Sequence, residues 1–244
     1  MTTTLDPAEV AKFAKTAARW WDADGPYAPL HRLNPARLAF IRERVAARFG
    51  PPETPRTPFA GLDFLDLGCG GGLVSEPLAR LGAALTAIDA EAETLRIAAA
   101  HAQAQGLAIH FREAAAEDLA AEGARFDVVC ALEIIEHTAD APAFLRLAAE
   151  LVRPGGLLIL STLNRTPKAY ALGILAAERV LRWLPPGTHD YARFLRPEEM
   201  AQPLREAGLA VDAPVGLSLD LRTGAFALSE DVAINYLLAA EKPA

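Results

Sequence analysis

The stretch LDFLDLGCGGG, residues 62–72, decides the fold class. Its first part is mainly apolar and predicts a short strand, and the glycines that follow predict a tight turn into a helix over residues 73–81. A glycine-rich turn between a first strand and a helix is the nucleotide-binding position of doubly wound sheets. The stretch therefore predicts an α/β fold with a ligand site at the carboxyl end of the first strand.

Strands and helices alternate on the carboxyl side of this stretch. Further strands are expected at residues 84–88, 108–111, 126–131 and 157–162, and helices at residues 91–105 and 140–152. Beyond Asn164 two more helices are expected at residues 168–184 and 197–207, and the last two strands within residues 209–238. This alternation predicts a mostly parallel, seven-stranded sheet, and right-handed crossovers place helices on both of its faces.

The N-terminal part follows a different pattern. Apolar spacing predicts a helix from Pro7 to Asp22, and Asn34 followed by Pro35 indicates the start of a second helix that ends near Gly50. Four prolines within residues 51–58 indicate a linker. We therefore expect a helical cap and linker over residues 1–58 and a main domain over residues 59–244, with a helical insertion at about residues 165–196.

The composition limits the class of protein. The chain has 244 residues, a length that suits one α/β domain, and its 24 Lys and Arg against 31 Asp and Glu give a formal net charge of -7. An acidic chain does not predict nucleic-acid binding, because neutralising phosphates requires a basic face. Cys69 and Cys130 predict no disulfide framework. Neither a secretory signal nor a membrane-spanning run is evident, so the expected compartment is the cytoplasm.

The spacing of the glycines indicates the ligand. A dinucleotide-binding turn has the pattern Gly-x-Gly-x-x-Gly, but after Gly68 and Gly70 the third glycine position holds Leu73. Asp66, just before the loop, suits a cationic sulfonium and amino-acid ligand better than a pyrophosphate. The pattern resembles the S-adenosylmethionine loop of methyltransferases, although a tight turn without a ligand would use the same glycines.

Two acidic positions extend this candidate cofactor site. Asp89 ends the second strand, where a carboxylate can accept hydrogen bonds from ribose hydroxyls. NAD enzymes use the same arrangement, so Asp89 alone does not discriminate between the two cofactors. The pair Glu117-Asp118 lies where methyltransferases commonly contact adenine, and Asp118 is therefore a candidate contact. A surface turn and a solvated loop would explain these acids without a ligand.

A third cluster follows the strand expected at residues 126–131. If the turn is helical, Glu133, Glu136 and His137 share one face. Two carboxylates and an imidazole could bind a divalent cation, magnesium more than zinc, and a bound cation would stabilise a phenolate. His137 could instead act as a general base. The plain alternative is two solvated acids and a histidine that caps the next turn.

At this point the chain resembles the ubiquinone-biosynthesis O-methyltransferase family. The matching stretches are residues 13–22 with RWWD, PLHRLNP at 29–35 followed by Arg37, residues 65–72, EIIEH at 133–137, PGG at 154–156, STLNR at 161–165, GTHD at 187–190 and DVAINY at 231–236. Many methyltransferases share the glycine loop, whereas the Trp-Trp-Asp, Leu-His-Arg-x-Asn-Pro and Ser-Thr-Leu-Asn-Arg motifs are more specific. The resemblance implies a Rossmann-like S-adenosylmethionine-dependent methyltransferase fold.

The resemblance also implies an activity and a site. It implies two O-methylations in ubiquinone synthesis, one on a polyprenyl catechol and one on a later quinol. It implies cofactor contacts from Arg37, Gly68, Asp89 and Leu132, a position where family members carry Met and where Leu keeps an apolar wall. Glu133, Glu136 and His137 match the family's metal-binding Glu-x-x-Glu-His motif, which implies magnesium. An O-methyltransferase with another acceptor, a cofactor-binding scaffold and an NAD dehydrogenase are the rival hypotheses.

A substrate with an isoprenoid tail stays in the bilayer, so the implied enzyme must approach a membrane. Residues 168–183 combine Lys168, Arg179 and Arg182 with apolar side chains and Trp183, as an interfacial helix requires. An ordinary amphipathic helix over the active site would show the same pattern. We therefore expect transient contact with the inner membrane from the cytoplasmic side, and a ubiquinone-biosynthesis protein complex as a further partner.

Overall fold

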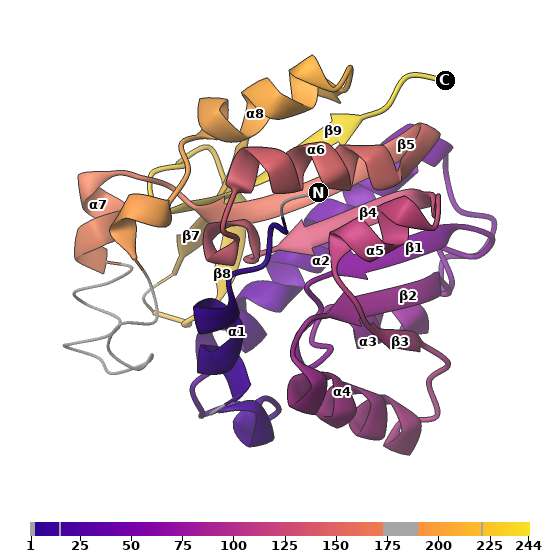
Figure 1. Cartoon of the computed structure of the whole chain (residues 1–244), viewed down its shortest axis with the longest axis horizontal. Helices are drawn as coiled ribbons and strands as arrows, with labels where there is room; N and C mark the ends of the chain where they lie inside the picture. The colour runs from indigo at the N-terminus through magenta and orange to yellow at the C-terminus, as the bar shows by residue number, and fades with distance from the viewer. Residues whose placement is uncertain (1–2, 15, 173–189, 221) are drawn as a thin grey trace.

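The computed structural model describes residues 3–14, 16–172, 190–220 and 222–244, whose strands form one nine-stranded sheet (Figure 1). The strands are β1 Asp63–Leu67, β2 Ala84–Asp89, β3 His110–Glu113, β4 Phe126–Leu132, β5 Val152–Leu163, β6 Ala210–Val211, β7 Val215–Leu219, β8 Phe226–Ser229 and β9 Asn235–Glu241. The α-helices are α1 Pro7–Ala14, α2 Ala28–Phe49, α3 Ser75–Arg80, α4 Ala92–Ala104, α5 Ala116–Ala121, α6 Ala141–Leu151, α7 Pro167–Ala169 and α8 Pro197–Glu206. The short 3-10 helices are η1 Ala17–Arg19, η2 Ile135–His137 and η4 Tyr191–Arg193.

The sheet has a parallel half and an antiparallel half. Neighbouring strands run parallel in the order β3-β2-β1-β4-β5. Beyond β5 the strands β9, β7 and β8 follow in antiparallel pairing, and β6 pairs with β9. The expected α/β fold with its mostly parallel core is confirmed.

The antiparallel half contains more strands than we expected. Residues 210–241 form four strands rather than two, which makes nine strands in the described sheet rather than seven. β6 has two residues and β8 four, too few to show a clear pattern in the sequence. The hairpin from β7 to β8 turns through Gly224, whose φ of 69° lies in the left-handed region that favours glycine.

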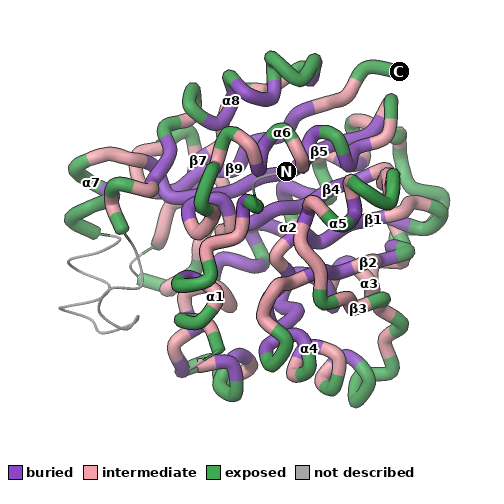
Figure 2. The backbone as a smooth tube through the Cα atoms, in the orientation of Figure 1, coloured by how far each residue is buried: buried purple, intermediate pink, exposed green. Residues whose placement is uncertain are grey.

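Successive residues of the central strands face opposite layers. Phe64 and Val128 point into a core with α2 and α3, whereas Leu65 and Val129 point into a core with α5, α6 and α8. Because both faces are covered, the central strands β1 and β4 and the inner part of β5 are mainly apolar, whereas the edge strand β3 is polar and not buried. Figure 2 shows these strands buried between helices with exposed outer faces. Helices on both faces therefore agree with the expectation from right-handed crossovers.

The second helix begins earlier than Asn34 and Pro35 suggest. α2 starts at Ala28, with Pro29 in its first turn, and Pro35 lies inside it. An internal proline removes one helical hydrogen bond, but buried apolar residues on both sides of Pro35 hold the helix to the sheet. Asn34 is not an N-cap: its side chain is buried and its Nδ2 donates to the carbonyl of Leu73, 2.5 Å away, next to the glycine loop.

The segment before α2 is less regular than predicted. The helix expected from Pro7 to Asp22 is α1 followed by the separate turn η1. Of the insertion expected at about residues 165–196, residues 173–189 lie outside the described residues, and the described ends contain α7 and η4. Among the residues that the structure describes, no helix combines the length and apolar character needed to cross a bilayer. The division into residues 1–58 and 59–244 stays a prediction.

Candidate active site

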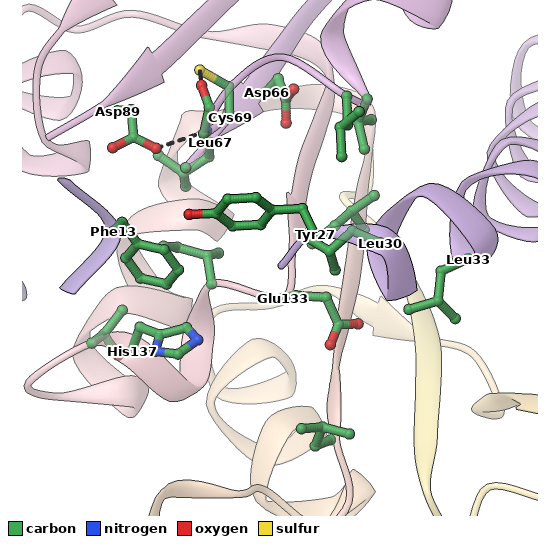
Figure 3. Close-up of a pocket in the computed structure, with 18 of the residues that line it drawn as sticks. Phe13, Tyr27, Leu30, Leu33, Asp66, Leu67, Cys69, Asp89, Glu133 and His137 are labelled. Carbon is green, nitrogen blue, oxygen red and sulfur yellow. Dashed lines mark hydrogen bonds between the residues drawn. The ribbon is translucent and has the colours of Figure 1, made fainter. Parts of the chain in front are cut away.

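A cavity of about 570 Å³ lies at the carboxyl ends of the parallel strands. The loops that follow β1 and β4 meet there, because these two strands are neighbours in the sheet but not in the sequence. Such a switch point is where open α/β sheets bind their ligands. The opposite wall comes from α1, η1 and the start of α2, and Figure 3 shows Phe13 and Tyr27 facing the loops.

The glycine loop has no room for side chains. Gly68 and Gly70 have φ values of 75° and 52°, in the region that side chains disfavour. A Cβ on Gly68 would lie 2.6 Å from the side chain of Ile134, and a Cβ on Gly70 would lie 2.2 Å from the ring of Trp20. The glycines therefore serve close packing of the loop as well as its turn.

Two acids flank this loop, the buried Asp66 and the half-buried Asp89. Asp66 accepts a hydrogen bond from Ser75 Oγ at 2.5 Å, and burial raises the pKa of its carboxyl to about 6. Asp89 accepts from the backbone N–H of Gly70 at 2.8 Å and of Glu91 at 2.9 Å, and burial raises its pKa also. Each carboxylate oxygen has two lone pairs, so Asp89 holds the loop and retains acceptor capacity toward the cavity.

The other cofactor candidates divide into two groups. Arg37 and Leu132 line the cavity together with Asp66, Gly68, Gly70 and Asp89. Asp118 does not line it, because its side chain accepts from the backbone N–H of Ala115 at 2.8 Å at the start of α5. The cavity wall beside it is formed by Ala114, Ala115 and Ala116.

Glu133 follows β4 in a strained conformation. Its φ of 54° is the one left-handed value of a non-glycine residue among the described residues, and such a conformation costs about 1–3 kcal/mol. Its backbone N–H donates to the carbonyl of Ser161 at 3.0 Å, and its Oε1 accepts from Ser161 Oγ at 2.7 Å. The same oxygen lies 3.2 Å from Nη2 of the buried Arg37. Neighbouring groups therefore hold this backbone in place.

Glu136 and His137 point to different partners. Glu136 is buried and accepts from Thr162 Oγ1 at 2.8 Å, and burial, with the charge of Glu133 nearby, raises the pKa of its carboxyl. His137 lines the cavity, and its Nδ1 lies 2.9 Å from Oε2 of Glu9 on α1. That hydrogen bond is the main reason that the pKa of Glu9 is lowered to about 2.

The expected metal site does not fit this arrangement. The left-handed Glu133 precedes η2, so Glu133, Glu136 and His137 do not share one helical face as expected. Each has another partner, and within the described part of the chain no group of three His, Cys, Asp or Glu is placed to hold a metal ion. Magnesium stays a prediction, and no step proposed below uses a metal.

Several site residues gave no signal in the sequence. Tyr27 lies in the middle of the cavity in the view of Figure 3, and burial raises the pKa of its hydroxyl. Glu9 occupies an ordinary helix position with no motif around it, and only the tertiary fold brings it to His137. Ser161 and Thr162 lie in the motif at residues 161–165, which indicated the family but not their bonds to Glu133 and Glu136.

Part of the cavity lining is rich in apolar side chains. It comes from the end of β5, the residues after α7 and the β7–β8 hairpin, and it includes Leu163, Leu172, Leu217, Leu219 and Phe226 beside the polar Lys168, Ser218 and Asp231. Leu172 is 49% exposed, so the lining reaches the surface beside α7. The cavity can therefore contact both a polar group and an apolar chain.

Comparisons with known proteins agree with this geometry. A family model described as a methyltransferase domain matches residues 31–213. The ubiquinone biosynthesis O-methyltransferase of Caulobacter vibrioides is 53% identical over 239 residues, which cover 98% of this chain and 95% of that protein. The protein of the same name from Cereibacter sphaeroides is 47% identical over 243 residues, which cover 99% of this chain and 98% of that protein.

Solved structures support the fold. Magnesium protoporphyrin IX methyltransferase from Synechocystis PCC 6803 with bound S-adenosylmethionine has a TM-score of 0.61 at 19% identity, covering 99% of this chain and 100% of that chain. A possible histamine N-methyltransferase from Thermotoga maritima has a TM-score of 0.62 at 15% identity, covering 96% and 98%. From the sequence relatives, the family model and this fold it follows that the chain is an S-adenosylmethionine-dependent methyltransferase of the ubiquinone biosynthesis O-methyltransferase family.

Proposed function

We propose that this enzyme methylates a hydroxyl of polyprenylated catechol and quinol precursors of ubiquinone, at both O-methylation steps. The names of the relatives support the substrate class. The observation that carries the proposal is the cavity itself, whose lining combines the glycine loop, His137 and apolar side chains such as Leu163 and Leu172. A cofactor, a ring hydroxyl and an isoprenoid tail require three such sets of lining residues.

The proposed cofactor site consists of Arg37, Asp66, Gly68, Gly70, Asp89 and Leu132. Asp89 accepts from the ribose hydroxyls, and Asp66 offers negative charge to the ammonium group of the cofactor. An arginine guanidinium can bind a carboxylate through two parallel hydrogen bonds. The Nε of Arg37 has no hydrogen-bond partner within the described part of the chain, so this side chain can bind the cofactor carboxylate. We leave Asp118 out of this site, since its side chain is bonded to Ala115 and lies off the cavity.

The proposed chemistry begins with the substrate hydroxyl. A phenol has a pKa of about 10, so little phenolate exists at neutral pH. His137 accepts the hydroxyl proton while the oxygen forms its bond to the methyl carbon and the carbon–sulfur bond breaks. The bonding electrons remain on sulfur, which leaves as the neutral thioether of S-adenosylhomocysteine, and His137 then releases the proton to solvent. General-base help of this kind contributes about 10²–10⁴-fold in rate.

Glu133 and Glu136 have supporting roles in this proposal. Glu133 neutralises part of the charge of Arg37 and fixes the loop through Ser161. Glu136 ties the same loop to β5 through Thr162. A magnesium ion at these residues would require their side chains to converge, which they do not do within the described part of the chain. A comparison of activity with magnesium and with chelator decides whether it binds.

Contact with a membrane is part of the proposal, because the substrate tail stays in the bilayer. Of the segment expected to make that contact, residues 168–183, only residues 168–172 are described. Tyr170 and Leu172 are 43% and 49% exposed there, next to Lys168, which supports a surface facing lipid. Attachment to the cytoplasmic side of the inner membrane and membership of a ubiquinone-biosynthesis complex remain predictions.

The test is transfer of labelled methyl from S-adenosylmethionine to a short-tailed catechol and to the corresponding demethylated quinol. We expect product with both acceptors, and a loss of about 10²–10⁴-fold in kcat for His137→Asn. Asp89→Ala should weaken cofactor binding and leave kcat at saturation less affected. Cofactor binding without transfer to either acceptor would favour a different acceptor or a scaffold, and full activity of His137→Asn would remove the base role.

A further inference from the structure

The imidazole of His137 is paired with a carboxylate from the N-terminal helix. Nδ1 of His137 lies 2.9 Å from Oε2 of Glu9, although the two residues are 128 positions apart in the sequence. Glu9 is 6% exposed. A carboxylate is seldom buried to this extent unless it is paired. Its other oxygen accepts from Lys12 Nζ at 2.6 Å, so both oxygens are occupied. The hydrogen bond between Glu9 and His137 is therefore part of a buried, fully paired arrangement in the cavity wall.

The same helix holds the ring from a second direction. Phe13 lies one helical turn after Glu9 on α1, and its ring meets the imidazole edge to face, with centroids 5.1 Å apart and planes at 85°. Residues four apart share one face of a helix, so Glu9 and Phe13 contact His137 together. Figure 3 shows the Phe13 ring next to the His137 ring, and both residues line the cavity. Two contacts of different kinds, both from α1, therefore restrain its orientation.

The carboxylate also determines which ring nitrogen carries the proton. An ionised carboxylate can only accept hydrogen bonds, so Nδ1 of a neutral His137 must be the donor to Glu9. In that tautomer Nε2 has the lone pair and can act as the acceptor of a proton. A carboxylate behind a general-base histidine is known to hold the productive tautomer in hydrolases of unrelated fold.

We propose that Glu9 is a positioning residue for His137, which holds the imidazole in the Nδ1–H tautomer with Nε2 as the base. The inference rests on the proposed function in so far as that function assigns the base role to His137. It adds a residue of α1 to the groups that prepare the base, although the sequence of this helix contains no motif that indicates such a role.

A simpler role for α1 would be to close the cavity. Asp6, the residue before α1, accepts from Nη2 of Arg193 at 2.7 Å and ties the helix to η4. Nη1 of the same Arg193 lies 4.0 Å from Oε1 of Glu9, so Asp6 and Glu9 share this tether, whereas the hydrogen bond to Nδ1 of His137 comes from Glu9. If α1 served only to close the cavity, loss of the Asp6 or of the Glu9 hydrogen bond would lower kcat by a similar factor. Asp6→Asn is therefore the matched control for Glu9→Gln, because both replace a carboxylate by an amide of the same size.

The variant Glu9→Gln should reverse the tautomer. Oε1 of Glu9 faces two cations, Lys12 Nζ at 2.6 Å and Arg193 Nη1 at 4.0 Å, which can only donate. In Glu9→Gln the amide oxygen therefore takes this place, and the NH₂ group turns to Nδ1 of His137. Nδ1 must then accept, and the ring proton moves to Nε2, where it blocks the base. We expect kcat to fall about 10²-fold or more and the KM for S-adenosylmethionine to stay within about 2-fold, whereas Asp6→Asn should change kcat by less than about 3-fold.

Nitrogen-15 NMR of the histidine rings gives a readout that does not depend on activity. The His137 signals are assigned by their absence in His137→Asn, and they should show Nδ1–H in the wild type and Nε2–H in Glu9→Gln. An unchanged tautomer, or equal losses of kcat in Glu9→Gln and Asp6→Asn, would overturn the inference. An inactive His137→Asn with a fully active Glu9→Gln would overturn it and leave the proposed function intact, whereas a fully active His137→Asn would remove the base role itself.

Discussion

The cavity has two walls that differ in how their sequence relates to their position. The sheet wall consists of residues 66–70, Asp89, residues 132–134 and His137, which lie at or shortly after the carboxyl ends of parallel strands. The N-terminal wall consists of Glu9, Phe13, Trp20 and Tyr27, which lie on short helices and turns. Strand ends reach their place through backbone pairing, whereas the N-terminal wall is held largely by side-chain contacts, such as the hydrogen bond between Glu9 and His137 and the packing of Trp20 against the glycine loop. The first wall can be located from the sequence, and the second requires the tertiary structure.

The largest expected effect tests whether the N-terminal wall is a separate unit. Trp20 is 6% exposed, stacks on Tyr27 with centroids 3.9 Å apart, and would contact any side chain placed at Gly70 or Gly71. Trp20→Ala should destabilise this wall by about 3–5 kcal/mol, which hydrogen exchange can measure as about 10²–10⁴-fold faster exchange of α1 amides. The amides of β1 should change little.

Phe49→Ala is the control for this change, because Phe49 ends α2 and is 38% exposed. We expect a cost below about 1 kcal/mol there, since little apolar area leaves a packed environment. Equal acceleration of α1 and β1 amides in Trp20→Ala would contradict the distinction between the walls, because it would show one cooperative unit.

The second prediction concerns the charge of Asp66 in the sheet wall and its effect on stability. The folded-state pKa of Asp66 is raised to about 6 from its ordinary value of 3.8, so the folded protein binds this proton more tightly than the unfolded chain. The free energy of unfolding therefore falls as the pH rises from about 4 to about 6. The fall is roughly 3 kcal/mol for a pKa difference of about two between the folded and unfolded states. Asp66→Asn should remove this loss, because a neutral amide of the same size can still accept from Ser75.

Urea unfolding without cofactor, at about pH 4 and about pH 7, measures the effect. We expect the variant to be more stable than the wild type by up to roughly 3 kcal/mol at the higher pH and similar to it at the lower pH. Its affinity for S-adenosylmethionine should nevertheless fall about 10-fold or more at neutral pH, since a hydrogen bond to a charged group is worth about 1.5–3 kcal/mol. An equal difference at both pH values would show that the charge of Asp66 is not the cause.

The difference between the two walls explains how much of the fold and of the candidate site could be predicted from the sequence. The alternation of strands and helices gave the parallel half of the sheet, and the glycine loop with Asp89 gave the position of the cavity. The Asn34-Pro35 signal was wrong as a helix start, because the buried Asn34 serves a contact with Leu73 rather than a cap. The expected shared face of Glu133, Glu136 and His137 failed for a similar reason, since a backbone held by Ser161 and Arg37 has no local sequence signal.

The smallest expected effect tests the contact between the walls. Gly70 and Gly106 both have positive φ values, 52° and 68°, but a Cβ on Gly106 meets nothing within 4 Å, whereas one on Gly70 meets the Trp20 ring at 2.2 Å. Gly106→Ala should therefore cost only the backbone strain, about 1–2 kcal/mol. Gly70→Ala should cost about 1–3 kcal/mol more, because the ring must move.

A double-mutant cycle separates the two contributions to the cost at Gly70. In the Trp20→Ala background the ring is gone, so Gly70→Ala should cost no more than Gly106→Ala does, and the coupling energy should equal the extra 1–3 kcal/mol or so. Thermal unfolding of the four proteins in the cycle measures this coupling. If Gly70→Ala costs the same in both backgrounds, the Trp20 ring does not lie against the loop in solution, and the N-terminal wall is not seated on the sheet wall before the cofactor binds.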